Sequence, residues 1–153
     1  MKINFYAFRA IYLHEMDRFR RTLTQSVLSP VLTTSLYFIV FGSVIGGYVE
    51  KIDGISYGSY IVPGLLMLTL LTQSISNTSF GIFFPKFNGT IYEILAAPIS
   101  TVEVVLAFVG AGATKTLIVG LMIFITSMFF VDVSVKFPLL MIFLLLSVSF
   151  TFA

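Results

Sequence analysis

The sequence contains no cysteine and no tryptophan, and its single histidine is His14. Without cysteine the chain cannot form a disulfide, a thiolate metal site or a cysteine nucleophile. One histidine also excludes a metal site built from several histidines. We therefore expect no metal and no resident cofactor in this chain.

Charge is scarce as well. Only 10% of the residues are charged and 58% are hydrophobic, and the mean hydropathy is +1.02. Soluble domains carry about 25% charged residues, so this chain cannot assemble a surface that faces water. Its apolar side chains must face lipid or each other, which predicts an all-α integral membrane protein folded as a polytopic helical bundle.

Long stretches without charge predict the membrane spans. No charged residue lies between Arg21 and Glu50 or between Asp53 and Lys86, and each stretch exceeds the roughly 20 residues that cross a bilayer as a helix. The spans are expected at about residues 27–48, 59–84, 104–131 and 137–153. The last apolar run has no polar flank where it stops, so we expect an incomplete fourth span and interpret 1–153 as the N-terminal part of a larger transmembrane domain.

Residues 5–21, before the first span, have the pattern of an amphipathic helix. A stripe with helical spacing contains Phe5, Phe8, Tyr12, Met16 and Phe19, and the opposite side carries His14, Asp17, Arg18 and Arg21. We interpret this segment as a helix that lies in the membrane interface with the stripe toward the lipid. The alternative is an amphipathic helix packed on a protein core.

The distribution of basic residues predicts the orientation. Five precede the first span and one lies between spans two and three, namely Lys2, Arg9, Arg18, Arg20, Arg21 and Lys86; the other two loops hold only Lys51 and Lys136. The positive-inside rule places the N-terminus and the 85–103 loop in the cytoplasm, and the loops near 49–57 and 132–137 outside. The protein is therefore expected to be a multi-pass protein of the inner (plasma) membrane.

The cytoplasmic loop predicts a short helix. Asn88-Gly89 is a turn dipeptide, and Thr90 with Glu93 fits a capping box, in which the hydroxyl and the carboxylate each accept a backbone N–H of the other residue. The helix presents Ile91, Ile94 and Leu95 on one side and ends before Pro98. A second capping box, Ser100 to Glu103, begins the third span. We interpret the short helix as a docking element for a cytosolic protein; the alternative is a linker that lies on lipid.

Four segments in order resemble the permeases of type-2 ABC exporters. They are Glu15–Arg21 in the basic amphipathic start, Leu36–Gly42 in span one, Tyr60–Gly64 at the start of span two, and Ile91–Pro98 in the loop. The resemblance covers nearly the whole chain. It implies a six-span permease that pairs with a second permease, expected to be a homodimer, and moves drugs, lipids or polysaccharides outward.

The same resemblance implies the partners. The coupling helix would be formed by Thr90, Ile91, Tyr92, Glu93, Ile94 and Leu95, and it would contact a separate ATP-binding subunit that holds ATP and Mg. Membrane lipids are the other expected partners, and nucleic acid is not one. An ion-coupled secondary transporter or another polytopic membrane protein is the alternative, although the carboxylates typical of such transporters are missing from the spans.

Glycine and proline suggest sites of helix packing in the first two spans. Gly42 and Gly46 form a GxxxG motif, which permits close contact with another helix, either in a second subunit or within this one. Pro63-Gly64 is expected to kink span two or to give it an irregular start, since proline removes a backbone donor.

Polar residues in the spans suggest a translocation path. Thr69, Gln73 and Asn77 recur every four residues with Ser76 beside them, and such a stripe faces a bundle interior or a cavity. Ordinary interhelical hydrogen bonding is the alternative. Lys115 is the one charge inside a predicted span, expected in the inner half, where it is either snorkelling or hydrogen-bonded, or lies at the pore entrance.

The run from Gly110 to Thr116 has a superficial likeness to a phosphate-binding loop. That motif requires glycine where this chain has Val109 and Thr114. The small residues fit close helix packing better, so the chain is not expected to bind ATP itself. A membrane-embedded enzyme would need clustered acidic residues or histidine within the spans, and none is present there.

Overall fold

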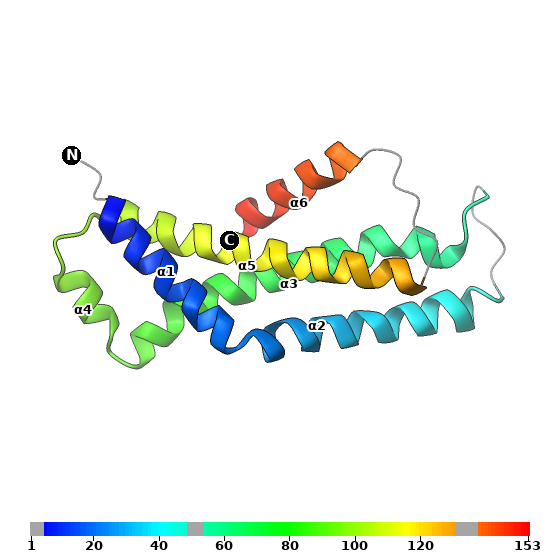
Figure 1. The fold of residues 1–153 in the computed structure, drawn as a ribbon, viewed down its shortest axis with the longest axis horizontal. Coiled ribbons are helices and arrows are strands. Elements are labelled where there is room, and N and C mark those ends of the chain that lie inside the picture. The colour runs from blue at the N-terminus through cyan, green and yellow to red at the C-terminus, as the bar shows by residue number, and fades with distance from the viewer. Residues whose placement is uncertain (1–4, 49–53, 131–137) are drawn as a thin grey trace.

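The computed structural model describes residues 5–48, 54–130 and 138–153, all of whose regular elements are helices (Figure 1). In chain order these elements are α1 (Phe5–Arg21), α2 (Leu23–Tyr37), the π-helix η1 (Phe38–Ile45), α3 (Tyr57–Phe87), α4 (Ile91–Ala96), α5 (Thr101–Phe130) and α6 (Pro138–Phe152). Lys2, Lys51, Lys136 and most of the loops expected on the outside lie beyond the described residues.

In the part of the chain that the structure describes, three helices are long and apolar enough to cross a membrane, which confirms the polytopic helical bundle. They cover Leu23–Gly42, Tyr57–Phe87 and Thr101–Phe130, and α6 is a shorter apolar helix. Each long helix begins a few residues before the expected span, at Leu23, Tyr57 and Thr101.

The long helices run side by side, and α1 crosses them obliquely at one end of the bundle (Figure 1). The short helix α4 lies at the same end, whereas η1 and the last turns of α5 point to the opposite end. This matches the predicted arrangement, in which the N-terminal helix and the α3–α5 connection share one side of the membrane.

The central helix is α5. Half of the most apolar stretch of α5 is buried inside the protein, compared with 28% of that of α3 and 11% of that of the first span, Leu23–Gly42. Phe19 of α1 packs on Val119 and Ile123 of α5, and a second apolar cluster joins Leu66 and Leu70 of α3 to Leu145 of α6. Val27 and Val31 of α2 pack against the first cluster as well, so α1 and α2 share one contact surface on α5.

Small residues allow α3 and α5 to approach closely. A Cβ added at Gly112 would collide with Thr78 Oγ1, and one added at Gly120 would collide with Leu70 Cδ2. Gly112 belongs to the run that superficially resembled a phosphate loop, and that run is continuous α-helix in the structure. Its interpretation as a packing surface is confirmed.

The GxxxG motif lies at the end of a π-helix, Phe38–Ile45. The Gly46 amide donates to the carbonyl of Phe41 at 3.1 Å, and a Cβ at Gly46 would collide with the carbonyl oxygen of Gly42 in its own chain segment. Within the described chain Gly46 therefore closes the end of η1. Close contact of the motif with a helix of a second subunit stays a prediction.

Pro63-Gly64 does not give α3 an irregular start. Both residues are exposed in the second turn of α3, whose helical structure continues from Tyr57 to Phe87. Nothing lies within 4 Å of a Cβ added at Gly64, and helix packing at this site stays a prediction. Pro63 lacks the N–H that would donate to the carbonyl four residues earlier, so α3 loses one helical hydrogen bond near its start.

Candidate functional site

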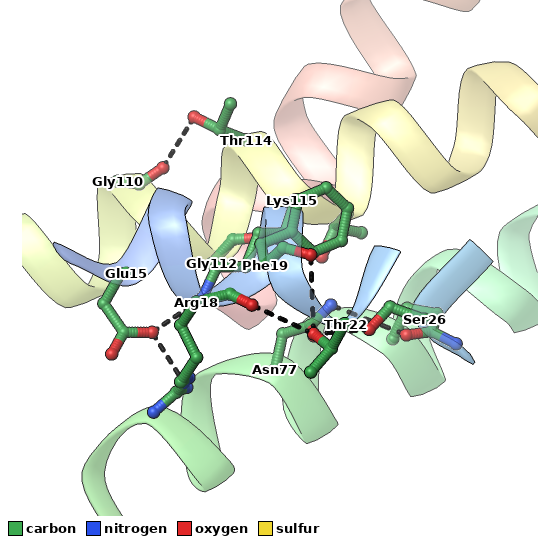
Figure 2. Close-up of polar contacts among 12 residues, drawn as sticks. Glu15, Arg18, Phe19, Thr22, Ser26, Asn77, Gly110, Gly112, Thr114 and Lys115 are labelled. Atoms are coloured by element: carbon green, nitrogen blue, oxygen red, sulfur yellow. Dashed lines mark hydrogen bonds and ion pairs between the residues drawn. The ribbon is translucent and has the colours of Figure 1, made fainter. Parts of the chain in front are cut away.

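A buried ion cluster joins α1 to α5 (Figure 2). Lys115 Nζ donates to Glu15 Oε2 at 2.6 Å, and Arg18 Nη2 contacts the same oxygen at 2.8 Å. The side chains of Lys115 and Glu15 are only 4% and 3% exposed, whereas Arg18 is 30% exposed. One carboxylate oxygen thus holds two cations on two helices that are far apart in the sequence.

The amphipathic helix brings Glu15 to this position. Glu15 lies between Tyr12 and Phe19 on the inner side of α1 and precedes Arg18 by one helical turn. Phe19 packs into the α5 surface, and the Tyr12 hydroxyl donates to Thr114 Oγ1 at 3.0 Å. The helix over residues 5–21 is confirmed, but the structure places the later part of its apolar stripe on α5 rather than on lipid.

An open cleft lies beside the ion cluster, with a volume of about 490 Å³. Its polar and charged lining comes from α1, α2, α3, α5 and the residue that joins α1 to α2, and consists of Arg18, Thr22, Gln25, Ser26, Ser76, Asn77 and Lys115. The rest of the wall is aromatic and is made by Phe19, Phe80 and Phe84.

The structure brings together three of the five residues predicted for a translocation path. Ser76, Asn77 and Lys115 all line the cleft. Thr69 lies nearer the start of α3, outside the cleft. Its hydroxyl donates a hydrogen bond to the carbonyl of Leu65 at 2.8 Å, as threonine commonly does within a helix. Gln73 accepts a long hydrogen bond of 3.5 Å from Asn77 Nδ2, which links it to the edge of the cleft.

Sequence reasoning missed Glu15. Its neighbours were interpreted as an apolar stripe and a charged face, and the carboxylate lies between them. The available signal was Lys115, since a lysine within a span requires a partner or a route to water. The described residues contain no group of three His, Cys, Asp or Glu side chains that could hold a metal ion.

The short helix between the spans forms as expected. Gly89 adopts φ = +78°, which suits the predicted turn, and α4 ends at Ala96, before Pro98. Tyr92 and Leu95 are 73% and 68% exposed, while Ile91 and Ile94 are half-buried. The exposed apolar surface of α4 is therefore Tyr92 with Leu95.

One capping box is wrong and the other forms in part. Thr90 has helical dihedral angles and makes no side-chain cap; its carbonyl accepts from the Glu93 amide at 3.1 Å instead. A cap requires extended dihedral angles, and the turn at Gly89 does not leave Thr90 in them. At the start of α5, the Ser100 amide donates to Glu103 Oε2 at 3.0 Å, which is the carboxylate half of the predicted second box.

Comparison of the sequence with known proteins identifies its family. The model of the ABC-2 type transporter family matches residues 6–153. The chain belongs to the ABC-2 type transporter family. The permease is 37% identical over 135 residues to the inner membrane transport permease YadH of Escherichia coli (strain K12), and matches the YadH protein of Shigella flexneri equally.

Each match covers 88% of this chain and 53% of the relative, so the permease sequence spans about half the length of the curated relatives it matches. No solved structure matches the chain. The family agrees with the resemblance that the four sequence segments suggested. Helix α4 covers most of the residues predicted for the coupling helix, and their docking role stays a prediction.

Proposed function

We propose that the permease is the membrane subunit of an ATP-driven exporter, and that a separate ATP-binding subunit docks on α4 and hydrolyses ATP with Mg. The proposal places the N-terminus in the cytoplasm of a multi-pass inner-membrane protein and pairs the permease with a second copy. Drugs, lipids and polysaccharides remain equally good substrates. The chain itself contributes no ATPase site.

The observation that carries the proposal is the exposed apolar surface of α4. Tyr92 and Leu95 extend from a helix that is held between two membrane helices, at the end of the bundle where α1 also lies (Figure 1). A short helix fixed at both ends transmits movement of a docked protein to α3 and α5. Exposed aromatic and aliphatic side chains of this kind are typical anchors of protein interfaces.

The test is co-purification of the ATP-binding subunit with the full-length permease. Leu95→Asp would place a carboxylate against an apolar groove, and we expect it to reduce the recovered partner by roughly tenfold or more. Transport-stimulated ATP hydrolysis should fall with it. Leu95→Met, which keeps the apolar contact, should retain both.

The matched control is Ile55→Asp. Ile55 is 51% exposed and lies two residues before α3, and α3 begins at the end of the bundle opposite α4 (Figure 1). The same added charge should leave partner recovery unchanged there. Equal recovery of the partner by Leu95→Asp and Ile55→Asp would show that α4 is a linker and remove the docking role.

A further inference from the structure

The cleft beside α1 carries more positive than negative charge. Arg18 and Lys115 line it, and Glu15 supplies the one carboxylate within ion-pair distance of either cation in the part of the chain that the structure describes. Two cations and one carboxylate leave a net charge of +1. An uncompensated charge in or near a bilayer is costly, so an anion bound in the cleft would stabilise the cluster.

The cleft reaches from the edge of the membrane-spanning region, at Thr22, to Lys115 in the middle of α5. Thr22 lines it, and the first span begins at the next residue, Leu23. The phosphate groups of lipids lie at this level, just outside the hydrocarbon core. The volume of about 490 Å³ falls within the range of about 300–1,000 Å³ that is common for small-molecule sites.

The lining suits an amphiphile better than a bare anion. The hydroxyl of Ser76 and the amide of Asn77 offer hydrogen-bond donors to phosphate oxygens, while Phe80 and Phe84 form an apolar wall that is largely exposed. Basic pockets between membrane helices bind anionic head groups in this way. We propose that the cleft binds the phosphate head group of an anionic phospholipid from the leaflet on the α1 side.

The test measures lipid retained by the purified full-length permease with native mass spectrometry. Phosphatidylglycerol and phosphatidylcholine each carry one phosphate, but only the first has a net negative charge. The wild type should retain phosphatidylglycerol in preference. Arg18→Gln removes the net charge of the cluster and should weaken phosphatidylglycerol binding roughly fivefold, with little change for phosphatidylcholine.

Two matched controls separate the cleft from general surface charge. Arg20→Gln removes a cation from the exposed side of the same helix, and it should leave retention unchanged. Ser76→Phe fills the cleft without changing charge and should also weaken binding, whereas Ser79→Phe, at an exposed position of α3 outside the cleft, should not. Gel filtration of each variant verifies that it is folded.

Equal retention of the two lipids by the wild type would overturn the proposal. The proposal would also be overturned if Arg18→Gln retained as much phosphatidylglycerol as Arg20→Gln, and Ser76→Phe as much as Ser79→Phe. If inorganic phosphate displaces phosphatidylglycerol at equal concentration, the cleft takes a free anion and the lipid assignment is wrong. The readout involves neither ATP nor transport, so its failure is distinct from failure of the exporter function.

Discussion

Glu15 is the residue on which the position of α1 depends most. Its carboxylate is buried and holds Lys115, which lies in the middle of α5. Removal of one member of a buried ion pair leaves the other without compensation, at a cost of about 3–5 kcal/mol. We therefore expect Glu15→Gln to lower the free energy of unfolding by about that amount, as measured by thermal denaturation in detergent.

Asp17→Asn is the control for this prediction, because Asp17 is exposed on the same helix. The double variant Glu15→Leu with Lys115→Leu should recover much of the lost stability, since an apolar pair can replace a buried ion pair. If Glu15→Gln is no more destabilised than Asp17→Asn, the ion pair does not hold α1 in place.

Two glycines in membrane helices should respond to alanine in opposite ways. At Gly112 the new Cβ would collide with Thr78 Oγ1, and such overpacking costs about 1–3 kcal/mol. At Gly64 the space is open, and alanine in a helix is favoured over glycine by up to about 1 kcal/mol. Thermal denaturation should show Gly112→Ala destabilised and Gly64→Ala unchanged or stabilised.

Thr78→Ala provides the rescue for the Gly112 variant. Thr78 Oγ1 is buried and makes no hydrogen bond among the described residues, so its loss leaves no partner unsatisfied. Combined with Gly112→Ala, it should restore most of the stability. A Gly112→Ala protein as stable as the wild type would contradict the close approach of α3 and α5.

At the scale of elements, α1 is a part of the bundle. Phe19 is 4% exposed in the α5 contact, whereas Phe5 is 65% exposed near the start of the same helix. Phe19→Ala should cost about 3–5 kcal/mol and release α1, seen as faster hydrogen exchange of its backbone amides. Phe5→Ala should leave exchange of α1 unchanged; equal effects of the two substitutions would indicate that α1 does not pack on α5.

The sequence predicted the existence of the α-helices well, and predicted poorly what each one contacts. The stripe from Phe5 to Phe19 gave α1 its limits, because helical periodicity is a local property. Periodicity cannot distinguish a lipid surface from the face of α5, and therefore it could not reveal the pairing of Glu15 with Lys115, which are 100 residues apart. Thr90 is a second case in which a local pattern was insufficient. Its predicted capping role required extended dihedral angles, and the preceding turn at Gly89 leaves Thr90 with helical ones.

The π-helix Phe38–Ile45 had no recognisable signal. The GxxxG spacing within it is shared by ordinary packing helices, and only the backbone geometry shows that Gly46 closes the turn. By contrast, the run around Gly112 was interpreted correctly because a helix of small residues has few functions other than close packing.

At the scale of the whole molecule, the account requires both ends of the bundle to face different compartments. Tyr48 is 90% exposed and follows η1, which points to the end of the bundle opposite α4 (Figure 1). Asn88 lies in the turn before α4. We expect a membrane-impermeant maleimide to label Tyr48→Cys in intact cells, and to label Asn88→Cys only after permeabilisation. Labelling of Asn88→Cys in intact cells would reverse the orientation and remove the docking argument with it.

The most direct test of the central claim is photocrosslinking from α4 in the full-length permease within the membrane. A photoreactive amino acid at Leu95 should crosslink to a protein that binds ATP, while the same group at Ile55 should not. Capture of the ATP-binding subunit from position 95 alone is the result the account predicts. Capture from both positions, or from position 55 alone, would contradict the claim that α4 couples this permease to ATP hydrolysis.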